Sequence, residues 1–188
     1  MWIDRFLELV PGERAVAVKN VSLAEDVLHH HFPSDSATGQ GALPIFPACF
    51  VVEGMAQTAG ILVGHARRFQ EKVILAKVNR LELEYDATPG TTLRYTATIS
   101  RMDDSGAATK GIVELIQHTT EGESTPVTVI GHIDMMFSHI DNNRSGLEFP
   151  EHNFVFSDAF RLLLESSGFD VDFVDSAASN RHAPNSTS

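Results

Sequence analysis

The chain has 188 residues, of which 43% are hydrophobic and 21% are charged, an ordinary balance for a globular protein. This length predicts one domain plus an appendage, with enough residues for a substantial core. The formal net charge of −11 argues against nucleic acid as a partner, and no apolar run reaches the roughly 20 residues of a membrane span without interruption.

The cysteine content and the N-terminal residues predict a location. The single cysteine, Cys49, excludes an intrachain disulfide and is compatible with a reducing compartment. The N-terminal stretch MWIDRFLELV has neither a basic start nor a small-residue cleavage site, so we expect no signal peptide. Together these features predict a cytoplasmic protein. We expect Cys49 itself to be packed in an apolar setting that keeps its thiol inert.

The chain is predicted to begin with a β-hairpin. Apolar residues partly alternate over residues 2–9, which predicts a strand, and Pro11-Gly12 predicts a turn. Residues 14–21 are rich in valine and short side chains and predict the returning strand.

A short helix is predicted after the hairpin. Ser22 is a good N-cap for a helix over residues 23–29, and Glu25 completes a capping box. This helix leads into three consecutive histidines at residues 29–31. Neighbours on an extended chain point in alternating directions, and chelating histidines are usually spaced more widely, so we expect no metal site here.

Pro47 predicts the start of a long helix, because its fixed φ and missing N–H suit the first helical turn. The segment continues without another proline through residue 69, about six turns at 3.6 residues per turn. Apolar residues fall on every face, which is typical of a buried helix. Its glycines predict close packing, because each lowers helix propensity by roughly 1 kcal/mol relative to alanine. They are Gly54, Gly60 and Gly64.

One acid, Glu53, and one amide, Gln57, interrupt this apolar helix. Because burying an unpaired carboxylate is costly, we expect the pKa of Glu53 to be raised. A carboxyl group that stays protonated near neutral pH can act as a general acid, and His31 is the candidate for the complementary base. Gln57 is expected either to orient Glu53 through an i,i+4 hydrogen bond or to satisfy another core partner.

Beyond this helix the pattern changes to period two, which predicts strands joined by turns. A long helix followed by an antiparallel meander predicts an α+β fold. The predicted strands are residues 73–85, 91–100, 108–118 and 127–137, with turns at 88–90, 103–106 and 121–124.

Three motifs follow one another in order: HFP at residues 31–33, PIFP at 44–47 and EGMAQ at 53–57. In this order they resemble the bacterial 3-hydroxyacyl-[acyl-carrier-protein] dehydratases of fatty acid synthesis, which have a hotdog fold. The similarity covers roughly residues 3–141. It implies a hotdog domain over residues 1–141, in which an antiparallel sheet wraps a long central helix.

The resemblance implies a hydro-lyase that converts a (3R)-3-hydroxyacyl thioester of acyl carrier protein into the trans-2-enoyl thioester. His31 is then the base that removes the C2 proton, and protonated Glu53 is the acid that protonates the leaving hydroxyl group. The backbone N–H groups of Ala48 and Cys49 are expected to hold the enolate oxygen. This chemistry requires no cofactor or metal. Candidates for lining an acyl tunnel, each also consistent with plain core packing, are Phe46, Phe50 and Met55.

The same resemblance implies two partners. One is acyl carrier protein, and the other is a second copy of the chain, in a homodimer or higher homo-oligomer whose sites take acid and base from different subunits. Because this chain and such a carrier protein are both acidic, we expect docking on a local basic patch. The same side chains are equally consistent with a solvated, dipole-complementing helix end. The docking candidates are Arg67, Arg68 and Lys72.

The sequence departs from the family pattern in two places. Residues 34–43 are a polar insertion, which either reshapes the entrance to the site or is a tolerated loop. Ala48-Cys49 follow Pro47 where the family usually has glycine. Two alternatives therefore stay open: a hotdog acyl thioesterase, or a non-catalytic acyl-binding or assembly protein.

Residues 142–188 are expected to form an extension beyond the resemblance. Residues 142–152 are loop-like, and Ser157 is expected to cap a short amphipathic helix over 158–166 that ends at Gly168. This helix is expected to dock on its own subunit, to cover a partner surface or to gate the substrate tunnel. The polar remainder is predicted to be disordered.

Overall fold

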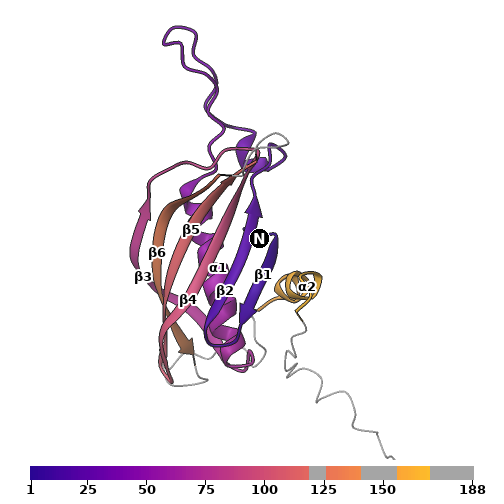
Figure 1. Cartoon of the computed structure of the whole chain (residues 1–188), viewed down its shortest axis with the longest axis vertical. Coiled ribbons are helices and arrows are strands. Elements are labelled where there is room, and N and C mark those ends of the chain that lie inside the picture. The colour runs from indigo at the N-terminus through magenta and orange to yellow at the C-terminus, as the bar shows by residue number, and fades with distance from the viewer. Residues whose placement is uncertain (119–125, 141–155, 170–188) are drawn as a thin grey trace, which may run out of the picture.

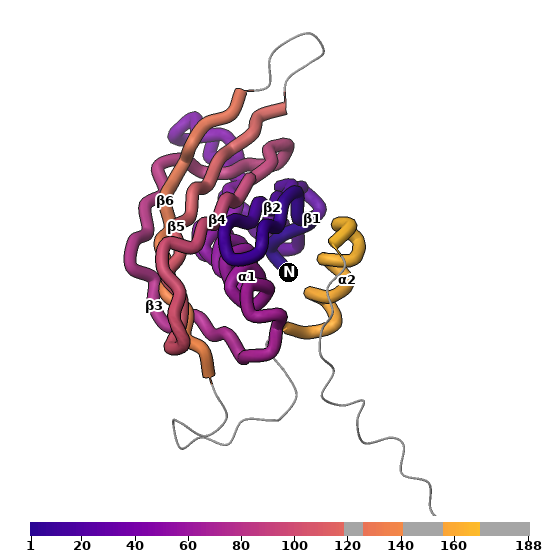
Figure 2. The backbone as a smooth tube through the Cα atoms, turned by 60° about the horizontal axis from the view of Figure 1, so that its bottom comes forward, coloured from indigo at the N-terminus to yellow at the C-terminus, as the bar shows by residue number. Residues whose placement is uncertain are grey.

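The computed structural model describes residues 1–118, 126–140 and 156–169. Within them, six strands form one antiparallel sheet in the order β1-β2-β4-β5-β6-β3. The sheet curves around helix α1, and helix α2 lies beside β1 (Figure 1 and Figure 2). The elements are β1 (Arg5–Val10), β2 (Arg14–Asn20), the 3-10 helix η1 (Asp26–Leu28), α1 (Ala48–Ala66), β3 (Lys72–Leu83), β4 (Thr91–Asp103), β5 (Gly106–Gln117), β6 (Val127–Ile140) and α2 (Asp158–Ser166).

This architecture confirms the predicted α+β hotdog fold, with each predicted strand present to within a few residues. The predicted turn at 121–124, the predicted loop at 142–152 and the polar tail lie outside the described residues. No helix in the described part of the chain is both long enough and apolar enough to cross a membrane.

The ends of α1 are set by local backbone chemistry. Pro47 occupies the N-cap with extended backbone angles (φ −60°, ψ 134°), as its restricted φ and missing N–H favour. At the other end the Arg68 N–H donates to the His65 carbonyl, and the Phe69 N–H donates to the Gly64 carbonyl. This is a Schellman-type ending, in which Arg68 takes the left-handed position (φ +53°) that glycine more often fills.

Only one face of α1 is buried against the sheet. Ala48, Cys49 and Glu53 are exposed. The predictions that this helix is buried all round, and that Cys49 is packed away from solvent, are therefore wrong for a single chain. The reason is that the sheet covers one side of the helix and leaves the Glu53 side uncovered. The buried positions are Val51, Gly54, Met55, Thr58, Ala59, Ile61, Leu62, Val63 and Gly64.

Two glycines let neighbouring rings approach α1 closely. A Cβ atom placed on Gly54 would stand 2.6 Å from Cζ and Oη of Tyr95, which reaches the helix from β4. A Cβ atom on Gly64 would stand 2.4 Å from Cζ of Phe156. Burial raises the pKa of the Tyr95 hydroxyl above its ordinary value, and this hydroxyl has no hydrogen-bond partner among the described residues. The close packing predicted from the glycines is thus confirmed at these positions.

The predicted helix over residues 23–29 is reduced to the single 3-10 turn η1. The Glu25 side chain does not close a capping box, because it accepts a hydrogen bond from the Lys19 ammonium group (2.5 Å). Lys19 is only 6% exposed and also donates to Asp4 (2.9 Å). Burial lowers the pKa of Lys19, but the hydrogen bonds to Glu25 and Asp4 outweigh it, so the pKa lies above its ordinary value. The acid predicted to cap a helix instead neutralises a buried cation.

The C-terminal helix α2 docks on its own subunit, one of the three predicted possibilities. Leu163 and Leu164 are buried against the body of the protein. The Phe6 N–H of β1 donates to Ser167 Oγ (3.0 Å), and this hydroxyl donates to the Leu163 carbonyl (2.7 Å). Gly168 ends the helix with φ +86°, as predicted, whereas the Ser157 side chain makes no capping hydrogen bond.

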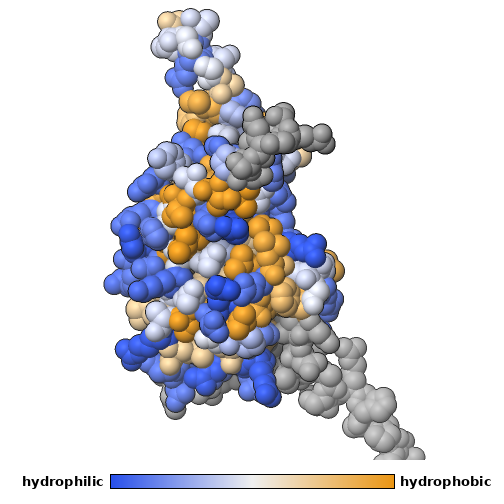
Figure 3. All heavy atoms as spheres, in the orientation of Figure 1, coloured by the Kyte–Doolittle hydropathy of each residue, from blue (hydrophilic) through white to orange (hydrophobic). Residues whose placement is uncertain are grey.

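Apolar side chains are also present on the outer surface of the sheet. Figure 3 shows them gathered over the strands that face the viewer. Large apolar residues that are exposed on strands are Leu7, Ile74, Leu75, Val78, Leu81, Ile112, Val127, Val129 and Met136. Because β3 ends the sheet order, its exposed apolar residues lie on an edge strand.

The glycines of α1 give a paired stability test. Gly54→Ala is expected to lower the free energy of unfolding by about 1–3 kcal/mol, because the new methyl group collides with the Tyr95 ring. Gly60→Ala is the matched control, since its Cβ would meet only Phe137, at 3.5 Å. We expect it to raise the free energy of unfolding by about 0.5–1 kcal/mol through helix propensity. Urea unfolding of both variants measures the difference, and equal effects would contradict the packing described here.

Candidate active site

Glu53 lies on the open face of α1, in the second turn of the helix. Gln57 Nε2 donates a hydrogen bond to Glu53 Oε1 (3.0 Å), so the predicted i,i+4 contact is present. The burial predicted for Glu53 is wrong for a single chain, because its carboxyl group is exposed. Within one chain, the Glu53 carboxyl group is oriented by the side-chain amide of Gln57, one turn further along the helix.

The N-terminal segment fixes the orientation of that amide. The Trp2 N–H donates to Gln57 Oε1 (2.9 Å). Because a backbone N–H can only donate, the oxygen of Gln57 must face Trp2 and its NH₂ group must face Glu53. The Trp2 ring stacks on Phe50 (centroids 3.7 Å apart) and meets Phe46 edge on (5.9 Å). Sequence reasoning missed Trp2, since no motif links it to the helix.

His31 follows η1 and is held by its backbone. Its Nδ1 atom lies 2.9 Å from the carbonyl oxygen of Leu28, and the side chain is half-buried. Because a carbonyl oxygen can only accept, we assign the proton of the neutral ring to Nδ1, which leaves the lone pair on Nε2. A histidine held in this tautomer is suited to remove a proton.

The insertion beside His31 forms an exposed arm, residues 32–43, that projects from the body (Figure 1). Isolated β-bridges join Phe32 to Leu43 and Asp35 to Gln40. Within the described residues, no hydrogen bond or ion pair connects His31 with Glu53 of the same chain. A single subunit therefore does not assemble the predicted pair by direct contact.

The start of α1 presents unpaired backbone donors. Among the described residues, no acceptor takes the N–H groups of Ala48 and Cys49, whereas the Phe50 N–H bonds the Pro47 carbonyl. Both residues are exposed, and no side chain caps this end. Free N–H groups at a helix N-terminus favour an anionic oxygen. The geometry thus suits the predicted oxyanion role of Ala48 and Cys49.

A pocket of about 220 Å³ lies beside Glu53. None of the predicted tunnel residues lines it: Phe46 is buried with Trp2, Phe50 stacks on Trp2, and Met55 packs against Gly111 of β5. The acyl-tunnel role of these residues remains a prediction. The residues that line the pocket are Glu53, Ala56, Gln57, Gly60, Ile61, Val73, Leu75, Phe137, Phe156 and Phe160.

The C-terminal segment contributes Phe156 and Phe160 to this pocket. The sequence left gating of the substrate tunnel by this helix open, but it assigned neither ring to a pocket. A signal for Phe156 exists in the sequence. This residue directly precedes Ser157, at the position where an apolar side chain often fixes the entry of the chain into a helix. The partner that Phe156 contacts, Gly64 of α1, lies far away in the sequence and is not predictable from that signal.

The three basic docking candidates have different surroundings. Arg68 is exposed, and Arg67 pairs with Asp104 (3.2 Å). Lys72 is only 6% exposed, so its predicted place in a surface patch is wrong. The reason is that the first two residues of β3, Lys72 and Val73, are buried, and the strand is exposed only from residue 74 onward.

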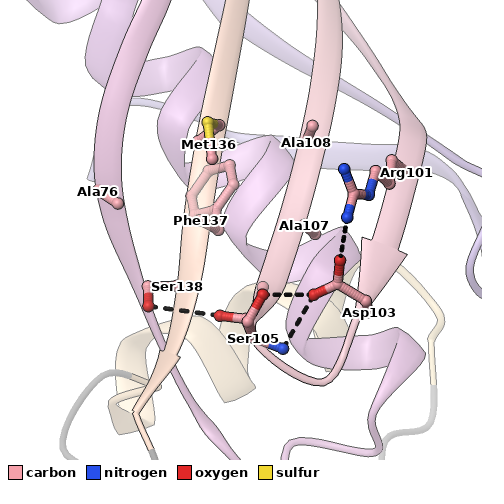
Figure 4. A pocket seen from close by; sticks show the side chains of 10 residues that line it. Ala76, Arg101, Asp103, Ser105, Ala107, Ala108, Met136, Phe137 and Ser138 are labelled. Atoms are coloured by element: carbon pink, nitrogen blue, oxygen red, sulfur yellow. Dashed lines mark hydrogen bonds and ion pairs between the residues drawn. The ribbon is translucent and has the colours of Figure 1, made fainter.

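A second hollow, of about 430 Å³, lies at the β4–β5 hairpin (Figure 4). Asp103 accepts hydrogen bonds from the Ser105 side chain and backbone and from Arg101. These bonds, led by that from the Ser105 hydroxyl, lower the pKa of Asp103 to about 2. An ionised, fully bonded carboxylate of this kind stabilises a turn and is not a proton donor near neutral pH.

Sequence relatives identify the family of this chain. Residues 1–122 match a family described as the FabA-like domain. The chain belongs to the FabA-like family. The 3-hydroxyacyl-[acyl-carrier-protein] dehydratase FabZ of Symbiobacterium thermophilum is 36% identical over 111 residues, which cover 58% of this chain and 72% of that protein. The FabZ of Latilactobacillus sakei is 32% identical over 122 residues, covering 64% of this chain and 78% of the relative. The predicted resemblance to dehydratases is thus confirmed.

Solved structures support the fold of this FabA-like chain. The dehydratase heterocomplex ApeI:P of Xenorhabdus doucetiae matches with a TM-score of 0.54 and 15% identity, over 77% of this chain and 86% of that chain. A thioesterase family protein of Silicibacter pomeroyi also reaches 0.54, with 12% identity over 72% and 83% of the two chains. At such identities the match establishes the shared fold and does not distinguish dehydratase from thioesterase.

The tautomer of His31 is open to measurement. At pH 8, where an ordinary histidine is neutral, we expect the ¹⁵N signals of His31 to show a protonated Nδ1 and an unprotonated Nε2. His30, which is exposed, is the control and is expected to show the usual mixture of tautomers. A predominantly Nε2-protonated His31 would contradict its assignment as a base through Nε2.

Proposed function

We propose that this protein dehydrates (3R)-3-hydroxyacyl-[acyl-carrier-protein] to trans-2-enoyl-[acyl-carrier-protein] in fatty acid biosynthesis. The observation that carries the proposal is the oriented acid: Glu53, held by Gln57, faces an apolar pocket on the helix whose N-terminal amides are unpaired. The family and the relatives named as FabZ dehydratases support the same reaction class.

The proposed reaction moves two protons and one water molecule. Nε2 of His31 removes a proton from C2, which the thioester carbonyl acidifies. The amides of Ala48 and Cys49 stabilise the enolate oxygen that develops. Protonated Glu53 then gives its proton to the C3 hydroxyl group, and the C3–O bond breaks to release water. Because the base and the acid must begin in opposite protonation states, we expect a bell-shaped dependence of kcat on pH.

We propose that the active protein is a homodimer or higher homo-oligomer with shared sites. Among the described residues of one chain, no hydrogen bond or ion pair joins His31 to Glu53, and the Glu53 face of α1 is uncovered. The edge strand β3 supports this, because residues 74–82 are all exposed and include Ile74, Leu75, Val78 and Leu81. An exposed, apolar edge strand is a ready template for pairing with another chain. Covering this side would also desolvate Glu53 and favour its protonated form.

Arg68 is the docking candidate best placed for an acidic carrier protein, because it is exposed at the end of α1. Arg67 lies next to it but is engaged with Asp104. Both are retained in the proposed docking patch, whereas Lys72 is not. We place the reaction in the cytoplasm, where a protein whose one cysteine is exposed stays reduced.

Two alternatives are separated from the dehydratase by their products. A hotdog thioesterase would release free thiol from an acyl thioester, which a thiol reagent detects. A non-catalytic acyl-binding or assembly protein would bind acyl thioesters and leave them unchanged. His31 favours the dehydratase. The Leu28 carbonyl holds its Nδ1–H, which leaves Nε2 as a base for removing the C2 proton. A thioesterase in which Glu53 activates a water molecule does not require this base.

The central test is hydration of a trans-2-enoyl thioester, followed by loss of the enoyl absorbance. His31→Ala and Glu53→Gln are each expected to lower kcat by about 10²–10⁴-fold, because each removes one proton-transfer group. His30→Ala is the matched control, since that exposed neighbour has no proposed role. Thiol release at a rate above hydration would instead support the thioesterase.

Shared sites predict complementation. When His31→Ala and Glu53→Gln subunits are unfolded together and refolded, mixed dimers contain one complete site. Activity is then expected to recover to about a quarter of the wild-type value. Each variant refolded alone is the control, and no recovery in mixtures shown to exchange subunits would exclude sites shared in this way.

Carrier docking predicts a substrate-dependent defect. Arg67→Glu with Arg68→Glu is expected to raise KM for the carrier-bound substrate by about 10-fold, because charge reversal repels an acidic partner. Turnover of a small pantetheine-type thioester is expected to stay near wild type. The control is Arg101→Glu, a reversal of another exposed arginine at the β4–β5 hairpin. Equal losses on both substrates would remove the docking proposal.

A further inference from the structure

The pocket beside Glu53 follows one face of α1 from the acid toward the end of the helix. Glu53, Gln57 and Gly60 all line it. Because residues three and four apart share a helix face, these three positions form a continuous track. At 1.5 Å per residue, the track from Glu53 to Gly60 is roughly 10 Å long.

The walls of this track are apolar. Val73 and Leu75 of β3 form one side, and Phe137 of β6 lies beside Gly60. Glu53 is the only charged residue among those that line the pocket. Beyond the acid, the lining therefore suits a hydrocarbon chain better than a polar group.

Two rings from the C-terminal segment stand at the far end of the track. Phe156 and Phe160 both line the pocket. The Phe156 ring lies directly on α1 at Gly64, one turn beyond Gly60, where a Cβ atom would be 2.4 Å away. It also meets the Phe69 ring edge on, with centroids 4.8 Å apart. A ligand that follows the track past Gly60 must meet these rings.

The rings are carried by a segment that is anchored to the sheet. Leu163 and Leu164 of α2 are 7% and 0% exposed, respectively. Ser167 accepts the hydrogen bond from the Phe6 N–H of β1. Because the anchoring residues lie about two to three turns beyond Phe156, the ring is held by the fold as well as by its own contact with α1.

The dimensions of the pocket limit what it holds. Its volume is about 220 Å³. A cavity of roughly 150 Å³ holds benzene, so by volume this pocket holds about nine carbon atoms. An extended chain advances roughly 1.2 Å per bond, so a track of roughly 10 Å holds about eight bonds. Volume and length agree.

We propose that residues 156–169 close the acyl pocket and limit the length of the acyl chain that the site accepts. This inference rests on the proposed dehydratase function and names its substrate class: chains that extend about eight carbons past C3, roughly eleven carbons in all. The closing segment lies outside residues 1–122, where the family match is found, so the limit is set by a part of this chain that the match does not include.

The test is the chain-length profile of enoyl hydration, with thioesters of about four to about sixteen carbons. In the wild type, kcat/KM is expected to fall by about 10-fold or more once the chain exceeds the limit. The double variant Phe156→Ala with Phe160→Ala opens the end of the pocket. It is expected to raise the ratio of kcat/KM for long over medium chains by about 10-fold or more. Leu162→Ala is the matched control, because Leu162 is on the same helix, is 66% exposed and lines no part of the pocket.

A second variant moves the limit in the opposite direction and does not depend on the C-terminal segment. Gly60→Leu places a side chain within the track, where the nearest atom to a new Cβ is Phe137 Cε1 at 3.5 Å. The chain-length limit is expected to fall by several carbons, so the ratio of kcat/KM for medium over short chains is expected to drop by about 10-fold. Thermal unfolding of each variant confirms that the protein used is folded.

Binding gives a readout that does not need turnover. Calorimetry with S-alkyl pantetheine thioethers of eight and sixteen carbons compares the same variants. Tighter binding of the sixteen-carbon probe to the Phe156→Ala, Phe160→Ala variant than to wild type supports the inference. An unchanged preference in both assays overturns it. If the wild type hydrates no thioester but the Phe156→Ala, Phe160→Ala variant still binds the sixteen-carbon probe more tightly than the wild type does, the dehydratase proposal is refuted. The inference that residues 156–169 close an acyl pocket then stands.

Discussion

The packing of α1 against the sheet is the constraint on which the rest of the molecule depends. One face of the helix must approach the strands closely enough for Tyr95 to lie on Gly54. That contact fixes the rotation of the helix, and the rotation leaves Glu53 on the uncovered side, with the half-buried Gln57 next to it. A small rotation would bury the acid in the core or separate it from the pocket. The position of Glu53 at the pocket therefore depends on the close packing of Gly54 against Tyr95.

Polar contacts from the N-terminal residues complete this arrangement. The Trp2 amide selects the orientation of Gln57, which in turn faces Glu53. Nearby, the buried Lys19 ammonium group is neutralised by Asp4 and Glu25, so the segment that carries Trp2 is tied to the end of β2. The site thus combines an acid that is held in place with a surface that is left open. The proposed second subunit would supply both the missing base and the missing cover.

Sequence patterns predicted the features that depend on local chemistry. Pro47 gave the helix start, period-two alternation gave the strands, and Gly168 gave the end of α2. The errors concern which side of an element meets another. A helix that is apolar all round is predicted to be buried, yet Cys49 and Glu53 are exposed, because the sheet covers only one side of the helix. Glu25 fits a capping box, but a buried lysine competed for it. The contact between Phe156 and Gly64 joins distant parts of the chain, and no local pattern at either residue predicts it.

The bond between the Phe6 amide and Ser167 joins residues 161 positions apart, from the first strand to the end of the last described helix. During synthesis the N-terminal residues emerge first. The residues of the sheet and of α1 therefore leave the ribosome before those that dock on β1. Up to that moment the groove along α1 is open at its far end. A newly made chain accordingly has exposed apolar surface at this groove until the segment that carries Phe156 and Phe160 has docked.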